Sequence, residues 1–405
     1  MRHTKLTVCV AVLLGLLLHS TAAAASPDDR DGGSAVPDPT QMEGFPDLPE
    51  EKGALLLQEF RATYSDLGGW KKRASAIRES IMEGAGLKPP PEKPPLEPLI
   101  HSRREHEGYS VANVAFQSAE GFYVTGNLYR PLERNGKVPA ILCPHGHWDE
   151  GRMRPAMQAR CAMLARMGAV VFAWDMVGFG DSTQVEHRNP HALSAQLWNG
   201  IRAVDFVQSL EGVDDSRIGA TGASGGATQT FLLTAVEDRI AATAPVVQVS
   251  SHFFGGCVGE SGKPIHSSPG TNNVEIAALA APRPQLIISD GSDWTATFPL
   301  VGYPYVKDVY RLYDAGPQVG NTHFYEGQHN YGYCKRIEVY KFFARALDLE
   351  RHPKLEMGGE TVPEQVAIEP KQKLRVWTDE HPMPDDALQG HEALARALGL
   401  RRRVE

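Results

Sequence analysis

The strongest fold signal in this chain of 405 residues is the stretch Arg217-Ile218-Gly219-Ala220-Thr221-Gly222-Ala223-Ser224-Gly225-Gly226-Ala227. Its first five residues are a short run of the kind that forms a buried strand. Glycines then surround Ser224, and residues 227–236 have a helical pattern. Glycine is required where a chain packs too closely for side chains. The stretch therefore predicts a strand, a tight turn that carries Ser224, and a helix.

The alternation of strand and helix continues on both sides of this stretch. Residues 138–143 and 169–174 are continuous apolar runs, which are typical of strands covered on both faces. Further strands are predicted at 242–249 and 285–289, a hairpin at 109–118 and 122–129, and helices at 156–167, 193–210 and 337–347. This order predicts an α/β fold with a mainly parallel central sheet and helices on both faces.

The chain outside this region divides by composition. We expect a signal peptide at 1–25, a flexible leader at 26–41, N-terminal helices and a proline-rich connector at 42–100, the catalytic unit at 101–349, and a C-terminal extension at 350–405. The N-terminal helices are predicted at 50–65 and 70–85. In the extension, a short strand is predicted at 374–377 and a helix at 387–398.

The first 25 residues have the three parts of a secretory signal. Arg2 and Lys5 give a positive start, residues 6–18 are apolar, and Ala22-Ala23-Ala24-Ala25 offers a cleavage site. The apolar stretch is too short to span a bilayer comfortably. We therefore expect a periplasmic or secreted protein that has no membrane contact after cleavage.

The charge of the chain limits its possible binding partners, and its cysteines raise the question of disulfide bonds. The formal net charge is −8, whereas nucleic-acid binding needs a concentrated basic surface. No nucleic-acid partner is expected. Export permits disulfides, and a Cys257–Cys334 bridge and four buried thiols are both open predictions. The sequence does not predict an oligomeric state.

Ser224 requires a base and an orienting acid, because a serine hydroxyl is a poor nucleophile at neutral pH. The acid is expected just after the strand at 285–289, where Asp293 is preferred and Asp290 is the alternative. The base is expected on a loop before the last core helix. His329 has that position, and His323 is its competitor.

A tetrahedral intermediate also needs backbone N–H donors for its oxyanion. The residue after the nucleophile, Gly225, is one predicted donor. The second is expected in the loop after the strand at 138–143, and His147 is the preferred residue there. Trp148 follows it and is either a sugar-stacking platform or a structural aromatic.

Three other interpretations have weaker support. His145 with His147, or His187 with His191, would offer paired metal ligands, but no carboxylate stands at metal-ligand spacing, so no metal is predicted. The serine turn also resembles a dinucleotide loop, and Tyr303 to Lys307 has the spacing of a short-chain dehydrogenase pair. That loop should follow the first strand of its domain, so no cofactor is predicted. A sugar-binding module without catalysis would lack part of the Ser-His-Asp set.

Several motifs together resemble those of known α/β-hydrolases. They are His145-Gly146-His147, Asp175-Met176-Val177-Gly178-Phe179-Gly180-Asp181-Ser182, the serine turn, Thr271-Asn272-Asn273-Val274-Glu275, Asp293-Trp294-Thr295 and Gly327-Gln328-His329-Asn330. The resemblance, over about residues 109–347, is to acetyl xylan esterase-like and dienelactone hydrolase-like enzymes. It implies carboxylester hydrolysis through an acyl-enzyme on Ser224, with Asp293 and His329 completing a triad.

The resemblance implies a small-molecule or polysaccharide ester substrate, with acetylated xylan-type carbohydrate as the first expectation. Acetyl xylan esterases of this kind usually have Gln after the nucleophile, whereas this chain has Gly225. Glucuronoyl esterases have a basic residue near the nucleophile, and none stands at this turn. Glucuronoyl and feruloyl esters remain alternative substrates.

Overall fold

The computed structural model describes residues 48–255, 270–349 and 364–400. The predicted signal peptide and leader lie outside these residues, as does Cys257, so its pairing with Cys334 stays a prediction. No helix in the described part of the chain is long and apolar enough to cross a membrane.

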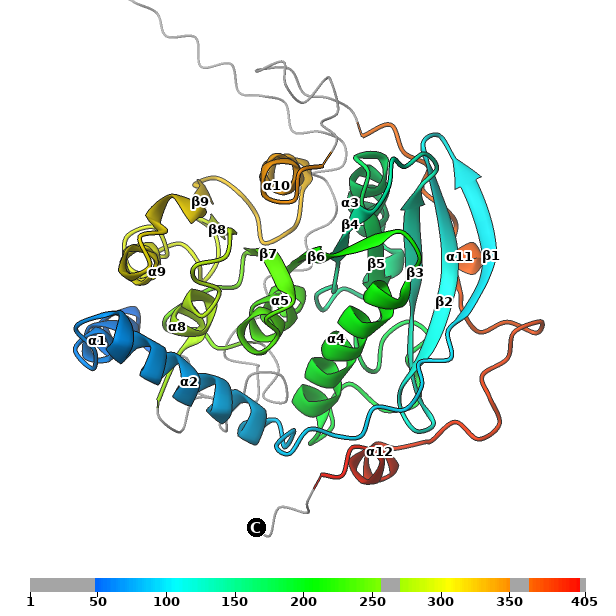
Figure 1. The fold of residues 1–405 in the computed structure, drawn as a ribbon, viewed down its shortest axis with the longest axis horizontal. Coiled ribbons are helices and arrows are strands. Elements are labelled where there is room, and N and C mark those ends of the chain that lie inside the picture. The colour runs from blue at the N-terminus through cyan, green and yellow to red at the C-terminus, as the bar shows by residue number, and fades with distance from the viewer. Residues whose placement is uncertain (1–47, 256–269, 350–363, 401–405) are drawn as a thin grey trace, which may run out of the picture.

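The described strands form one sheet in the spatial order β1-β2-β3-β5-β4-β6-β7-β8-β9 (Figure 1). Their bounds are β1 Leu99–His106, β2 Tyr109–Ala119, β3 Phe122–Pro131, β4 Val138–Leu142, β5 Val170–Trp174, β6 Val213–Ala223, β7 Ile240–Val246, β8 Gln285–Asp290 and β9 Val319–Phe324. The pairs β1–β2, β2–β3 and β3–β5 are antiparallel, and every pair from β5 to β9 is parallel. The carboxyl ends of β4, β6 and β8 therefore meet at one edge of the sheet.

Helices cover both faces of this sheet, so the predicted α/β-hydrolase fold is confirmed. In Figure 1, α3 (Pro155–Arg166) and α10 (Tyr333–Ala346) lie on one face, and α4 (Ala192–Ser209) and α5 (Gly225–Val236) lie on the other. α3 and α10 contribute to one cluster of buried apolar side chains, and α4 and α5 contribute to a second. The core is therefore two apolar layers with the sheet between them.

The N-terminal helices α1 (Glu50–Arg61) and α2 (Leu67–Gly84) pack against the second layer (Figure 1). In α2, the residues predicted from helical spacing are all buried: Trp70, Ala74, Ile77 and Ile81. Arg73 extends from α2 to the buried carboxylate of Glu275, with 2.7 Å between its Nη2 and Glu275 Oε2. Glu275 belongs to the short helix α8 (Asn273–Ala278), so the Thr271–Glu275 motif anchors the N-terminal helices.

The structure corrects one sequence prediction and adds one strand that was not predicted. The short strand predicted at 374–377 is wrong, because Lys371–Leu374 forms the helical turn α11. Carbonyl groups of this segment accept hydrogen bonds from side chains, not from a neighbouring strand: Asn113 Nδ2 donates to Lys373 O at 3.0 Å and to Arg375 O at 2.7 Å. β1 was not predicted, since its pattern has too few buried residues to alternate clearly.

The C-terminal segment is closely packed against the edge hairpin. Leu374 and Val376 are completely buried, and the helix predicted at 387–398 is present in shorter form as α12 (His391–Ala397). His101 Nε2 of β1 lies 3.0 Å from Val376 O. Residues 364–400 therefore complete the structure around β1–β3.

Candidate active site

Ser224 stands at the sharp turn between β6 and α5. Its backbone has φ 55° and ψ −128°, a conformation that is costly for a residue with a side chain. The turn is held by Ser224 N donating to Val246 O at 3.1 Å and by Ser224 O accepting from Ala227 N at 2.8 Å. Such strained turns raise a serine hydroxyl above the sheet in α/β-hydrolases.

The glycines of this turn are explained by close backbone contacts. A Cβ on Gly222 would stand 2.5 Å from Gly226 O, and a Cβ on Gly226 would stand 2.5 Å from Pro144 O. Both distances are far below van der Waals contact, and the obstructing atoms are backbone. The turn is therefore locked between β6 and the loop that follows β4.

His329 and Asp293 lie together on neighbouring loops. His329 Nδ1 is 2.7 Å from Asp293 Oδ2, and the two side chains are 7% and 0% exposed. The other carboxylate oxygen of Asp293 accepts from Thr295 N at 2.7 Å and from Thr295 Oγ1 at 2.5 Å. Because a carboxylate only accepts, His329 Nδ1 carries the proton and Nε2 is left as the basic nitrogen.

The two alternative residues have other partners. The buried carboxylate of Asp290 forms an ion pair with Lys335 and accepts from Ser292 N at 3.0 Å. His323 lies on β9 with its Nδ1 2.9 Å from Ser289 Oγ. Lys335 Nζ also donates to Gln328 O, beside His329. Asp290 and Lys335 therefore hold the histidine loop, while Asp293 contacts the histidine itself.

Trp294 is a further neighbour of His329 that sequence reasoning did not identify as a site residue. The ring centroids of Trp294 and His329 are 4.4 Å apart, and Phe253 stacks on Trp294 with ring centroids 4.0 Å apart. Trp294 therefore packs against His329 and is itself held by Phe253. The signal available in the sequence was its position directly after Asp293.

The loop after β4 is fixed by the ring of His145. Its Nε2 accepts from Met176 N at 2.9 Å, so Nδ1 carries a proton and donates to Gly146 O at 2.7 Å. His147 Nε2 is 3.1 Å from His187 Nε2, and His187 Nδ1 is 3.0 Å from Val177 O. No cluster of three or more His, Cys, Asp or Glu suited to a metal occurs among the described residues.

His147 also explains the glycine after the nucleophile. A Cβ on Gly225 would stand 2.6 Å from His147 Cε1 and 2.7 Å from its Nδ1. The imidazole thus occupies the space that a side chain at position 225 would need. The structure thus places the imidazole of His147 against Gly225, the residue that follows the nucleophile.

Two aspartates of the Asp175–Ser182 motif form a buried ionic network with Arg152. Arg152 Nε lies 2.9 Å from Asp175 Oδ2, and Arg152 Nη2 lies 2.5 Å from Asp181 Oδ2. Asp181 also accepts from Val376 N at 2.9 Å. Burial raises the pKa of Asp175, and the guanidinium of Arg152 opposes that rise. The motif is therefore structural, and the role of Arg152 was missed because its partners are distant in sequence.

The dehydrogenase alternative has no geometric support. Tyr303 and Lys307 lie on α9 (Gly302–Leu312). Tyr303 Oη donates to Val319 O at 3.3 Å, and Lys307 Nζ donates to Gly316 O at 2.6 Å. Both side chains are engaged with the backbone at the start of β9, and neither contacts the serine turn.

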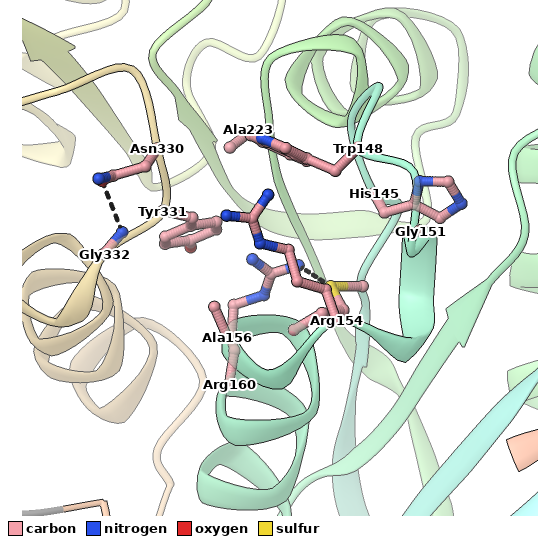
Figure 2. A pocket seen from close by; sticks show the side chains of 11 residues that line it. His145, Trp148, Gly151, Arg154, Ala156, Arg160, Ala223, Asn330, Tyr331 and Gly332 are labelled. Atoms are coloured by element: carbon pink, nitrogen blue, oxygen red, sulfur yellow. Dashed lines mark hydrogen bonds between the residues drawn. The ribbon is translucent and has the colours of Figure 1, made fainter. Parts of the chain in front are cut away.

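A pocket opens next to Ser224 and His329. Its cavity volume is about 30 Å³. Its lining consists of His145, Trp148, Gly151, Arg154, Ala156, Met157, Arg160, Ala223, Asn330, Tyr331 and Gly332. In Figure 2 the guanidinium ends of Arg154 and Arg160 point into the space between Trp148 and Tyr331.

Comparison with known proteins gives a consistent picture. Residues 92–255 match the family described as acetyl xylan esterase (AXE1). A solved structure described as Methylesterase BT1017 is 37% identical, covers 87% of this chain and 80% of its own, and superposes with a TM-score of 0.80. No curated protein matches the chain.

More distant structures share the fold. A glucuronoyl esterase from Solibacter usitatus is 16% identical, with a TM-score of 0.54 over 70% of this chain and 94% of that chain. A putative acetyl xylan esterase from Bacteroides fragilis NCTC 9343 is 17% identical, with a TM-score of 0.51 over 67% of this chain and 81% of that chain.

Proposed function

This chain belongs to the acetyl xylan esterase (AXE1) family of α/β-hydrolases and is a carbohydrate esterase, and from this premise we propose that Ser224, His329 and Asp293 carry out its reaction. The observation that carries the proposal is the buried contact of 2.7 Å between His329 Nδ1 and Asp293 Oδ2. It fixes the histidine tautomer that a serine nucleophile needs.

In the first half of the reaction, His329 Nε2 removes the proton from Ser224 Oγ as that oxygen attacks the ester carbonyl. The N–H groups of Gly225 and His147 stabilise the negative oxygen of the tetrahedral intermediate. When the intermediate collapses, the C–O bond to the alcohol breaks and His329 gives its proton to the leaving alcohol. An acyl group remains on Ser224.

In the second half, His329 removes a proton from a water molecule, and the resulting oxygen attacks the acyl carbonyl. The acid is released and the proton returns to Ser224 Oγ. Asp293 stays ionised throughout, keeps His329 oriented and stabilises its charged form. The reaction needs no metal or cofactor.

Two kinds of carbohydrate ester are candidates for the substrate. The family favours acetyl esters on a xylan-type polysaccharide, in which acetate forms the acyl-enzyme. The relative described as a methylesterase favours a methyl ester of a sugar acid, in which methanol is the leaving group. We place the methyl ester first, because that relative is 37% identical and covers 87% of the chain, whereas the family match covers residues 92–255.

We also propose that the esterase is exported, on the basis of the signal-like residues 1–25. A polymeric carbohydrate is too large to enter a cell intact, so an exported enzyme suits such a substrate. The test is to express the whole chain in a bacterial host. N-terminal sequencing of the mature protein should give a start near Ser26, and an uncleaved chain would contradict export.

Product analysis tests the choice of ester. The purified protein is incubated with acetylated xylan, acetylated mannan, methyl-esterified pectin, a methyl glucuronate ester and a long-chain aryl ester. We expect methanol release from the methyl esters to exceed acetate release from the acetylated polymers. The opposite order would return the assignment to acetyl esters, and release from none of the carbohydrates would contradict a carbohydrate esterase.

A further inference from the structure

Within residues 48–255, 270–349 and 364–400, Arg160 differs from the other buried arginines in having no carboxylate partner. Among the described residues, Arg152, Arg160, Arg202 and Arg336 are buried. Arg152 pairs with Asp175 and Asp181, Arg202 with Asp205, and Arg336 with Glu364. The guanidinium of Arg160 instead contacts the thioether of Met157 and lies 4.1 Å from the centre of the Tyr331 ring.

The neighbours of Arg160 are thiol, thioether and phenol groups and include no carboxylate. A guanidinium offers five N–H donors, and a thioether is a weak acceptor. Arg160 Nε is buried and has no hydrogen-bond partner in the described structure. Arg160 also forms a side-chain hydrogen bond with the thiol of Cys143, and Tyr331 and Cys161 are further electrostatic neighbours; together they raise the pKa of Arg160 against the effect of its burial. A buried charge without a counter-charge is costly, so this one requires an explanation.

The position of Arg160 supplies that explanation. It is 3% exposed but lines the pocket in Figure 2. Two other lining residues, Ala223 and Asn330, directly precede Ser224 and directly follow His329. A group bound against Arg160 would therefore lie beside the chain segments that carry Ser224 and His329.

The pocket has a positive lining in an acidic protein. Arg154 is a second lining cation, with its guanidinium carbon 5.2 Å from the centre of the Trp148 ring. Among the described residues, no Asp or Glu belongs to the lining, although the formal net charge of the chain is −8. A planar guanidinium in a small enclosed site matches a planar oxyanion such as a carboxylate.

We propose that this pocket is a subsite for a carboxylate carried by the substrate, separate from the ester that is cleaved. The substrate is thus a carbohydrate in which a free sugar-acid carboxylate lies close to the ester group. Arg160 supplies the buried N–H donors and Arg154 adds a second positive charge at the pocket. This inference rests on the proposed function and adds to it the charge of the substrate.

Matched inhibitors test the subsite. Galacturonate and galactose differ only in whether C6 is a carboxylate or a hydroxymethyl group. Each is measured as a competitive inhibitor of p-nitrophenyl acetate hydrolysis by the wild-type protein. We expect galacturonate to have an inhibition constant at least tenfold below that of galactose. Equal constants would overturn the proposal, and stronger inhibition by galactose 6-sulfate would reject a carboxylate as the ligand.

Variants then assign the effect to the arginines. Arg160→Met should raise the inhibition constant of galacturonate by about 10- to 100-fold, the range for losing a charged hydrogen-bonded contact. Arg154→Met should have a smaller effect in the same direction. Arg345→Met, at the exposed far end of α10, makes the same change of charge away from the pocket and is the control. An equal effect of Arg345→Met and Arg160→Met would contradict a specific subsite.

Thermal unfolding separates binding from a structural role. Because Arg160 lacks a buried counter-charge, the Tm of Arg160→Met should equal or exceed the wild-type Tm. Arg152→Met should lower Tm, since it leaves Asp175 and Asp181 unpaired. A comparable fall in both variants would make Arg160 structural and overturn the proposal.

Direct titration keeps the subsite distinct from the reaction. Calorimetry of galacturonate with wild-type protein and with Arg160→Met requires no turnover. If the wild-type protein binds galacturonate through Arg160 but does not hydrolyse p-nitrophenyl acetate, the proposed triad is contradicted and the subsite is not. If the wild-type protein hydrolyses p-nitrophenyl acetate but does not bind galacturonate, the subsite is contradicted and the triad is not.

Discussion

At the scale of single residues, the environments of Asp293 and Asp290 differ more than their positions in the sequence do. Asp290 is the last residue of β8 and Asp293 follows it by three residues, and both side chains are completely buried. Asp293 contacts His329, whereas Asp290 is neutralised by Lys335. One carboxylate thus orients the proposed base, and the other holds the loop on which that base lies.

Replacing Asp293 should affect activity, whereas replacing Asp290 should affect stability. Asp293→Asn allows the wrong histidine tautomer and should lower kcat for p-nitrophenyl acetate by about 10³- to 10⁴-fold with the fold retained. Asp290→Asn leaves Lys335 buried without its partner and should lower the free energy of unfolding by about 3 kcal/mol. Steady-state kinetics and urea unfolding of both variants are the measurements. Normal kcat in Asp293→Asn would reject it as the orienting acid.

A second residue-scale prediction concerns Gly225 and His147. The Cβ of Gly225→Ala would stand 2.6 Å from His147 Cε1, so the imidazole and its loop must move. Since one oxyanion donor comes from that loop in our account, kcat should fall on the order of 100-fold. The double variant Gly225→Ala/His147→Ala removes the clash and should recover at least part of the loss, measured as a double-mutant cycle. Wild-type activity of Gly225→Ala would contradict this arrangement.

The order and spacing of Ser224, Asp293 and His329 were accessible from the sequence, because each stands at a recognisable strand or helix boundary. The choice between Asp293 and Asp290 was weaker, since three residues of loop do not determine which carboxylate faces a histidine. The partners of Arg152 and the isolation of Arg160 were not accessible. They depend on which side chains meet across the fold, and no local pattern records that.

At the scale of elements, the C-terminal segment is attached to β1 through a buried histidine. His101 Nε2 donates to Val376 O at 3.0 Å, so Nδ1 of the neutral ring accepts from Ser102 Oγ at 2.9 Å, and the ring centroid lies 4.0 Å from that of His381. Burial lowers the pKa of His101, and the neighbouring His381 and Arg104 lower it further, while Glu380 acts in the opposite direction. The folded protein thus disfavours the protonated ring.

This attachment should weaken in acid. A histidine with a lowered pKa binds its proton more readily in the unfolded chain, so its contribution to stability is lost as pH falls below the ordinary value near 6.5. We expect faster hydrogen exchange in residues 364–400 at pH 5 than at pH 7, after correction for intrinsic rates. His101→Gln cannot titrate and should reduce the difference, whereas His391→Gln, on exposed α12, should not. An unchanged pH dependence in His101→Gln would assign it to other groups.

The sequence was less informative for this segment than for the core elements. Buried strands such as β4 and β5 consist of continuous apolar runs, and their predicted positions were confirmed within one residue. Leu374 and Val376 gave an alternating apolar pattern that is typical of a strand, but Leu374 ends the helical turn α11 and Val376 follows it in an irregular segment. Period alone does not distinguish a strand from a loop that buries alternate residues.

At the scale of the whole molecule, one sheet edge gathers the proposed chemistry. The loops after β4, β6, β8 and β9 supply His147, Ser224, Asp293 and His329 in turn. The C-terminal segment adds Val376 to the buried network of Arg152 and Asp181, and the N-terminal helices attach through Glu275. The segments outside the central α/β region are therefore part of the scaffold that holds this edge in shape.

The most direct test of this account is kcat for p-nitrophenyl acetate in Ser224→Ala, with wild-type circular dichroism as the check of folding. Removing the nucleophile of such a triad lowers kcat by about 10⁶-fold in a well-studied protease, and we predict a loss of at least 10⁴-fold here on the same grounds. A folded Ser224→Ala protein that keeps more than about a tenth of the wild-type kcat would contradict serine catalysis at this site.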